Sequence, residues 1–178
     1  MLEVRKRYTN EDSGSWIEIA ERDGPIMKVE RSYGPRTGRS DPHLHEDLTQ
    51  TWEALSGEGR IEVDGIEREF RTGDRVEMSP GLRHRDPWNP AGAGELHVRG
   101  TFDPDNEFIE GYAEAFAHLL ETGGLNDQEE LPLLQILVIA KATNGRSYGA
   151  SPPVALQKAS LPLLAAFGRL LGYKVSYD

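Results

Sequence analysis

Two short segments decide the fold of this chain: HLHEDLTQ at residues 43–50 and GDRVEMSPGLRH at residues 73–84. The first contains His43 and His45, which are separated by one residue. In a β-strand, side chains at this spacing point to the same face, so two imidazoles would form a rigid clamp for a metal ion. The same pair is also compatible with two half-exposed surface histidines, and the pair alone does not decide between these interpretations.

The residues on either side of these segments alternate between apolar and polar side chains, which predicts half-buried strands. The clearest alternating runs are residues 16–19, 26–29, 60–63 and 75–78. Asp64 and Gly65 lie between two apolar positions and predict a tight hairpin turn. Many short strands at such spacing predict a closed antiparallel barrel or jelly roll rather than a parallel sheet.

The chain changes character near residue 103, after which longer apolar stretches have helical spacing. Asp103 is expected to cap a first helix, with Pro104 as its first residue, and this helix should end at the glycines 123–124. Further helices are predicted over residues 130–143 and 154–171, the last one restarting at Pro162. The second of the three is apolar nearly all round, so we expect it to be buried.

These patterns divide the chain into two parts of one domain. We predict that residues 1–103 form the β-barrel and that residues 104–178 form a helical extension packed on it.

The 178 residues contain no cysteine, which excludes disulfides and thiolate metal ligands. Thirty acidic and 20 basic residues give a net charge of −10, which would repel nucleic acid.

Neither a targeting segment nor a membrane span is expected. The first residues lack the apolar stretch of a signal peptide, and the longest apolar run, residues 133–142, is too short to cross a bilayer. We therefore expect a cytoplasmic protein that binds neither nucleic acid nor a membrane.

The two segments quoted above resemble the two sequence motifs of the cupin superfamily, and the likeness covers about residues 38–100. The positions that match in order and spacing are His43, His45, Gly57, Gly73, Gly81 and His84. This resemblance implies a mainly β protein, with a double-stranded β-helix (jelly-roll) barrel and C-terminal α-helices packed on it. The C-terminal part is similar to the helical extension of a group of stand-alone bacterial cupins.

The resemblance also implies a metal site formed by His43, His45 and His84, with position 50 as the fourth ligand. Where the family has a carboxylate, this chain has Gln50, whose carbonyl oxygen is a neutral donor. Gln50 would bind the metal, form a hydrogen bond next to the metal ligands, or be exposed to solvent. Glu46 is an alternative carboxylate, although a regular strand would point it away from the histidines.

The implied cofactor is one divalent transition metal per chain (Fe, Mn, Ni, Zn or Cu). The alternative is a metal-free barrel in which the histidines are only a polar lining. His97, in a predicted strand at residues 96–99, is a candidate catalytic acid or base, or else a structural polar residue.

Among cupin reactions, three histidine ligands with open metal positions suit dioxygenase-like oxidation of a small organic molecule inside the barrel. The alternatives are an isomerase or cyclase and a barrel that binds a small ligand without catalysis. Cupins commonly dimerise through N-terminal strands, so we expect a C2 homodimer in which residues 4–8 and 16–19 cover an unpaired sheet edge.

Overall fold

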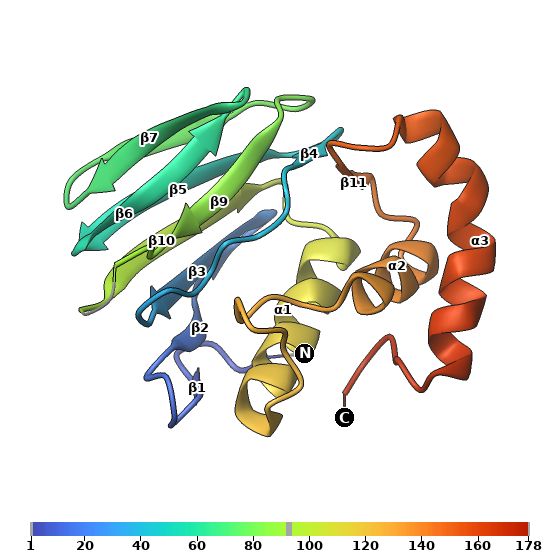
Figure 1. The fold of residues 1–178 in the computed structure, drawn as a ribbon, viewed down its shortest axis with the longest axis horizontal. Coiled ribbons are helices and arrows are strands. Elements are labelled where there is room, and N and C mark those ends of the chain that lie inside the picture. The colour runs from blue at the N-terminus through green and yellow to red at the C-terminus, as the bar shows by residue number, and fades with distance from the viewer. Residues whose placement is uncertain (1, 92–93, 178) are drawn as a thin grey trace.

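The computed structural model describes residues 2–91 and 94–177, and it contains two antiparallel sheets that face each other (Figure 1). The first sheet consists, in spatial order, of β1 (Arg7–Thr9), β2 (Trp16–Asp23), β3 (Ile26–Tyr33), β10 (Leu96–Asp103), β5 (Thr49–Ser56) and β8 (Arg75–Met78). The second consists of β11 (Ser147–Gly149), β4 (His43–His45), β9 (His84–Trp88), β6 (Glu58–Val63) and β7 (Ile66–Arg71).

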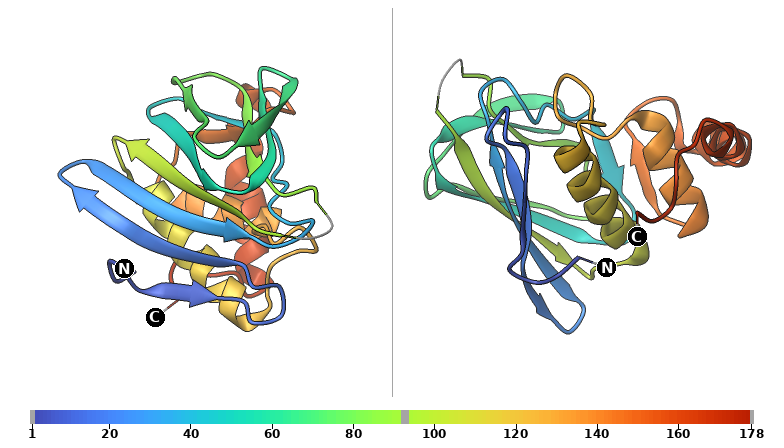
Figure 2. Two further views of the ribbon diagram at one scale, coloured as in Figure 1. Left: turned by 90° about the vertical axis from the view of Figure 1, so that its left-hand side faces the viewer. Right: turned by 90° about the horizontal axis from the view of Figure 1, so that it is seen from below.

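The order of strands in the two sheets is that of a jelly roll. From β3 to β10, consecutive strands cross from one sheet to the other, except where β6 and β7 form a hairpin and stay in the same sheet (Figure 2). As a result, β3-β10-β5-β8 faces β4-β9-β6-β7. The turn of the hairpin is the expected Asp64–Gly65 pair, with φ values of 52° and 77°. The predicted barrel is confirmed.

The three helices form successive layers on one side of the barrel (Figures 1 and 2). α1 (Glu107–Thr122) packs against β1 and β2, α2 (Leu133–Ala142) packs against α1, and α3 (Val154–Leu170) packs against α2. Between α2 and α3 the chain returns to the barrel as β11, which pairs with β4 at the edge of the second sheet. The sequence did not indicate this extra strand.

α1 begins later than the sequence predicted. Asp103 is the last residue of β10 and pairs with Thr49 of β5, so the sheet holds it in extended conformation. The cap of α1 is instead Asn106, whose side-chain oxygen accepts hydrogen bonds from the backbone N–H groups of Phe108 and Ile109 at 3.0 and 3.1 Å. The expected cap at Asp103 is wrong because strand pairing extends through that residue.

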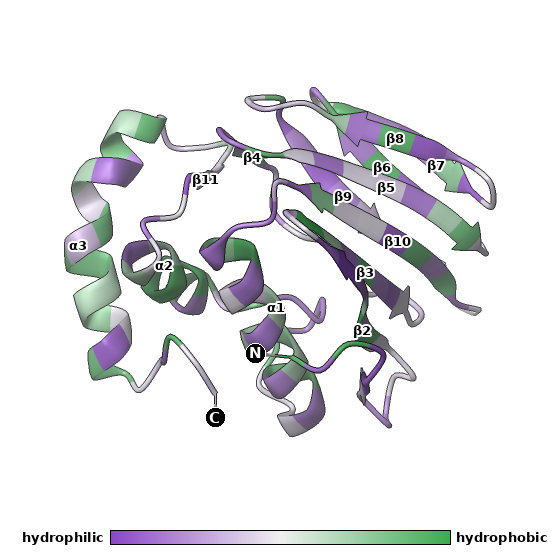
Figure 3. Cartoon of the chain, turned by 180° about the vertical axis from the view of Figure 1, so that it is seen from behind, coloured by the Kyte–Doolittle hydropathy of each residue, from purple (hydrophilic) through white to green (hydrophobic). Residues whose placement is uncertain are grey.

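The second and third helices also differ from the prediction. α2 begins at Leu133 rather than residue 130, because Glu130 is held by an ion pair of 3.0 Å with the buried Arg31 of β3. Leu133 is 66% exposed, so one end of this apolar helix reaches the surface. α3 continues through Pro162, and several of its apolar residues, such as Leu163 and Leu170, are exposed. The green stretches of α3 in Figure 3 mark its hydrophobic residues. Within the described ranges, no helix is long and apolar enough to cross a membrane.

The turn between β5 and β6 contains a glycine, Gly57, whose backbone lies very close to the backbone of Glu95, just before β10. Gly57 has a φ of 83°, and a Cβ there would overlap the backbone carbonyl oxygen of Glu95, whereas Gly65 has a φ of 77° and open space around it. Gly65→Ala should therefore cost about 1 kcal/mol of folding free energy for the left-handed backbone alone. Gly57→Ala should cost about 3 kcal/mol of folding free energy, because the backbone at Glu95 must also move. Urea unfolding measures both, and equal losses would contradict this interpretation.

Candidate metal centre

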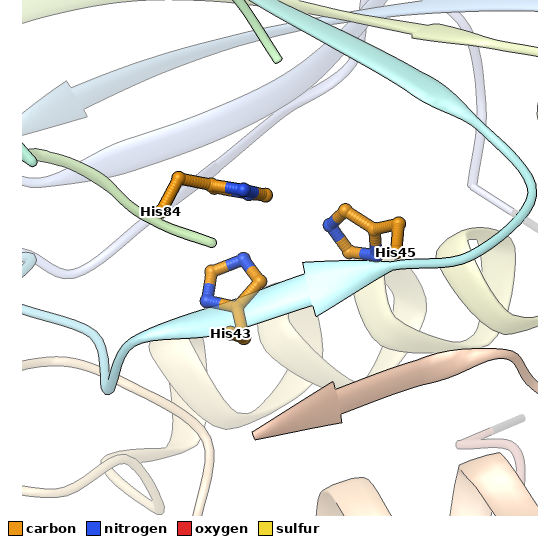
Figure 4. A group of neighbouring side chains, drawn as sticks. All are labelled: His43, His45 and His84. Carbon is orange, nitrogen blue, oxygen red and sulfur yellow. The ribbon is translucent and has the colours of Figure 1, made fainter. Parts of the chain in front are cut away.

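Three histidine side chains converge at one end of the second sheet (Figure 4). His43 and His45 lie on β4 with their side chains on the same face, as their spacing predicts. His84 is the first residue of β9 and lies directly opposite His43 in the antiparallel pairing. One ring nitrogen from each histidine lies within 4.8 Å of the others, so the three residues could bind a metal ion together.

Backbone hydrogen bonds set the orientation of two of the imidazoles. The Nδ1 atom of His43 lies 2.9 Å from the carbonyl oxygen of Asp41, and the Nδ1 atom of His84 lies 3.0 Å from that of Leu82. A carbonyl oxygen can only accept, so Nδ1 of His43 carries the proton and donates it, and Nε2 of a neutral His43 keeps its lone pair. This is the arrangement that metal-bound histidines usually have, and Nδ1 of His84 can donate to Leu82 in the same way.

His45 is oriented by a residue from the helical extension. Its Nδ1 atom lies 2.6 Å from the hydroxyl oxygen of Ser147, which stands opposite His45 in the pairing of β11 with β4. Its Nε2 atom is buried and has no hydrogen-bond partner among the residues that the structure describes. A buried ring nitrogen without a partner is costly, and this one lies in the group of nitrogens that converge.

Gln50 contributes a carbonyl oxygen to the same place. It lies on β5, in the opposite sheet, and is 2% exposed. Its Nε2 group donates to the Oδ1 atom of Asp86 at 3.0 Å, and Trp52 donates to the same oxygen at 2.8 Å. Because the carboxylate must face the NH₂ end of the amide, Oε1 of Gln50 is directed at Nε2 of His84, 2.7 Å away.

This contact leaves His84 between two acceptors, the carbonyl oxygen of Leu82 and Oε1 of Gln50. A neutral imidazole has one proton and can satisfy only one of them. Double protonation would satisfy both, but burial and the nearby His43 lower the pKa of His84 to about 4. A cation bound by both Nε2 and Oε1 would resolve the conflict, so the donor set fits a metal ion.

Burial keeps the cluster in the form that binds metals. Burial is the main cause that lowers the pKa of His45 to about 3, and the neighbouring His43 and His84 lower it further. His45 and His84 are therefore neutral at pH 7, and their Nε2 lone pairs are not lost to protons in the neutral range.

Asp86 is a residue of this site that sequence reasoning missed. It lies two positions after His84 on β9, and its Oδ2 atom is 3.8 Å from Nε2 of His43. Burial raises the pKa of Asp86, but the neighbouring histidines and the Trp52 donor lower it by more, so the carboxyl is ionised. The signal was present, because positions 84 and 86 of one strand face the same side. Ser147 had no comparable signal, since it is 102 residues away from its partner.

Two other candidates lie away from the cluster. His97 lies between the buried Leu96 and Val98 on β10 and faces the opposite side of that strand, where its Nε2 atom is 3.1 Å from Glu30. The structure does not bring it to the histidine cluster, so its position favours the structural polar role over the catalytic one. The carboxylate of Glu46 points to Arg146 and Lys158, as the strand alternation predicted, and not to the histidines.

The strand order, together with the histidines of β4 and β9, defines this protein as a jelly-roll barrel with the cupin fold. No family model and no curated protein matches the chain. Among solved structures, KdgF from Halomonas sp. is similar, with 20% identity over 59% of this chain and 93% of that one and a TM-score of 0.48.

Two further solved structures are similar over comparable shares of the chain. An RmlC-like cupin from Shewanella frigidimarina NCIMB 400 has 19% identity over 61% of this chain and 89% of that one, with a TM-score of 0.47. A Streptomyces PAC13 variant solved with uridine has 16% identity over 58% and 80%, with a TM-score of 0.43. The assignment of the fold rests on the strand order of the chain itself.

Proposed function

We propose that His43, His45 and His84 bind one divalent transition metal through their Nε2 atoms, with Oε1 of Gln50 as the fourth donor. The observation that carries the proposal is the 2.7 Å contact between Gln50 Oε1 and His84 Nε2, in a ring whose Nδ1 atom also faces a carbonyl oxygen, so that one proton cannot serve both acceptors. The buried Nε2 atom of His45, which has no partner at hydrogen-bond geometry among the described residues, also supports it.

The chemistry of the donors supports a transition metal such as Fe, Mn, Ni, Zn or Cu. Imidazole nitrogen suits these ions, whereas Ca²⁺ and Mg²⁺ prefer oxygen ligands. Three imidazoles and one amide oxygen add no negative charge, so the ion would be more electrophilic than one bound directly by a carboxylate. Four protein donors would also leave positions open on a six-coordinate ion for a substrate.

We propose that the centre acts on a small organic molecule by dioxygenase-like oxidation. A bound redox-active metal would supply the electron transfer that oxygen requires. His43 and Asp86 are the members of the site that reach solvent, with 21% and 19% of their side chains exposed, and the substrate would approach them from that side. Trp52 and Met78, both buried, would provide an apolar wall next to Gln50.

One observation favours a second candidate, an isomerase or cyclase. Asp86 is an ionised carboxylate beside the histidines, and such a group could accept a proton from a substrate whose carbonyl is polarised at the metal. Binding of a small ligand without turnover is the third interpretation.

A C2 homodimer also stays a prediction. β1 is the end strand of the first sheet, so a second copy of the chain could pair with it.

The metal site is tested by titrating the protein with Zn²⁺ against a chromophoric chelator. The wild type should bind one ion per chain, and His84→Ala should weaken binding at least about 100-fold, since even changes outside the ligand sphere typically cost 10–100-fold. His97→Ala serves as the matched control and should stay within about twofold, because His97 lies on the other side of β10. Equal affinities in the wild type and His84→Ala would overturn the metal site.

Oxygen consumption distinguishes the proposed reactions. Fe²⁺-loaded protein should consume oxygen when supplied with one class from a panel of small phenols, enols and thiols, and His84→Ala should abolish this consumption. An oxygen electrode measures the rate, and chromatography follows the added compound. Conversion of a compound without oxygen uptake would replace oxidation by isomerisation or cyclisation. Binding without conversion would leave the non-catalytic interpretation.

A further inference from the structure

Asp86 is connected to the metal centre through Gln50. Its Oδ1 atom accepts two hydrogen bonds, from the amide of Gln50 at 3.0 Å and from the indole of Trp52 at 2.8 Å. The same Oδ1 atom lies 3.9 Å from Nε2 of His84, and Oδ2 lies 3.8 Å from Nε2 of His43. The carboxylate therefore lies beside the converging nitrogens and fixes the rotation of the neighbouring amide.

We propose that Asp86 is a positioning residue that, together with Gln50, replaces a metal-bound carboxylate. Asp86 holds the NH₂ end of Gln50, so that the carbonyl oxygen faces His84, and it supplies the negative charge that the four neutral donors lack. This inference rests on the metal site proposed above. It adds that Asp86 supplies the negative charge next to the metal ion and that Asp86 orients the oxygen donor, Gln50.

The amide of Gln50 needs Asp86 to fix its orientation. The amide of Gln50 can rotate by half a turn at little steric cost, which would exchange its oxygen and its NH₂ group. With Asp86 ionised, the exchanged orientation would place the amide oxygen against a carboxylate oxygen. Asp86 thus allows only the orientation in which Oε1 of Gln50 faces Nε2 of His84.

The positions of the two oxygens of Asp86 support an indirect role over direct binding. Oδ1 already accepts two N–H donors, which reduces its capacity to bind an ion. Asp86 approaches His43 and His84 through different oxygens, and it does not join the three histidines in one group whose ligand atoms all lie within 4.8 Å of one another. The carboxylate is close enough to stabilise a cation by charge, while Gln50 provides the contact.

Two substitutions separate charge from orientation. Asp86→Asn can keep both hydrogen bonds by presenting its carbonyl oxygen at the Oδ1 position, so it removes the charge while the orientation of Gln50 is kept; its NH₂ group then replaces Oδ2, 3.8 Å from Nε2 of His43. Asp86→Ala removes the charge and both acceptor contacts, which frees the amide of Gln50. Glu30→Gln is the control for a general charge effect, because Glu30 is bound to His97 and Arg99, away from the cluster.

The probe is Co²⁺, followed by chelator competition and by its visible absorption spectrum, with thermal unfolding as a check on folding. Asp86→Asn should bind Co²⁺ about tenfold more weakly with an unchanged spectrum. Asp86→Ala should bind about 100-fold more weakly and should shift the spectrum, because the amide oxygen is no longer held. Glu30→Gln should match the wild type in both measurements.

A double-mutant cycle tests whether Asp86 acts through Gln50. In a Gln50→Ala background, Asp86→Ala should cost only about the tenfold charge effect, because there is no amide left to orient. The same 100-fold loss in both backgrounds would show direct binding by Asp86 and overturn the proposal. Affinities of Asp86→Asn and Asp86→Ala within twofold of the wild type would also overturn the proposal. If Asp86→Ala does not fold, the affinity of Asp86→Asn alone decides this test.

The wild type and His84→Ala, measured with the same Co²⁺ probe, distinguish a failure of the metal site from a failure of the role of Asp86. If the wild type binds Co²⁺ and His84→Ala does not, insensitivity to Asp86 overturns only the role of Asp86. If the wild type does not bind Co²⁺, the metal site fails, and the role of Asp86 fails with it.

Discussion

His84 is buried between two hydrogen-bond acceptors, and a neutral imidazole has a single proton to donate. Burial lowers the pKa of His84 to about 4, which prevents double protonation as a remedy at neutral pH. The carboxylate of Asp86 in turn prevents Gln50 from turning its NH₂ group towards His84. These constraints together leave one of the two carbonyl oxygens without a proton, and a cation bound by Nε2 and Oε1 would allow Nδ1 to donate to Leu82 and so satisfy all these groups.

The jelly roll produces this arrangement by bringing its two sheets together at one end. The pairing of β4 with β9 places His43 opposite His84, and the facing sheet supplies Gln50 and Trp52 from β5. The helical extension takes part as well, since β11 pairs with β4 and Ser147 contacts His45. The barrel and the extension are therefore coupled at the site, although they differ in secondary structure.

The parts of the site that the sequence predicted are those encoded by short spacing. The separation of His43 and His45 determines a common face, and the motif likeness brought His84 and Gln50 into the same group. Ser147 could not be predicted, because its contact depends on how the chain returns after α2. Asp86 could have been found from the alternation along β9, and His97 could have been excluded in the same way, since its neighbours Leu96 and Val98 face the core. α1 begins late because Asp103 pairs with Thr49 in the sheet. Local helix propensity could not predict this, because strand pairing depends on residues far away in the sequence.

The most direct test of the metal centre is X-ray absorption spectroscopy of the Zn²⁺-loaded protein, which counts the atoms bound to the ion. The structure predicts three imidazole nitrogens and at least one oxygen at about 2.0–2.2 Å, with one imidazole lost in His84→Ala. A spectrum with fewer than three imidazoles in the wild type, or one that His84→Ala leaves unchanged, would contradict the convergence of His43, His45 and His84 on a single ion.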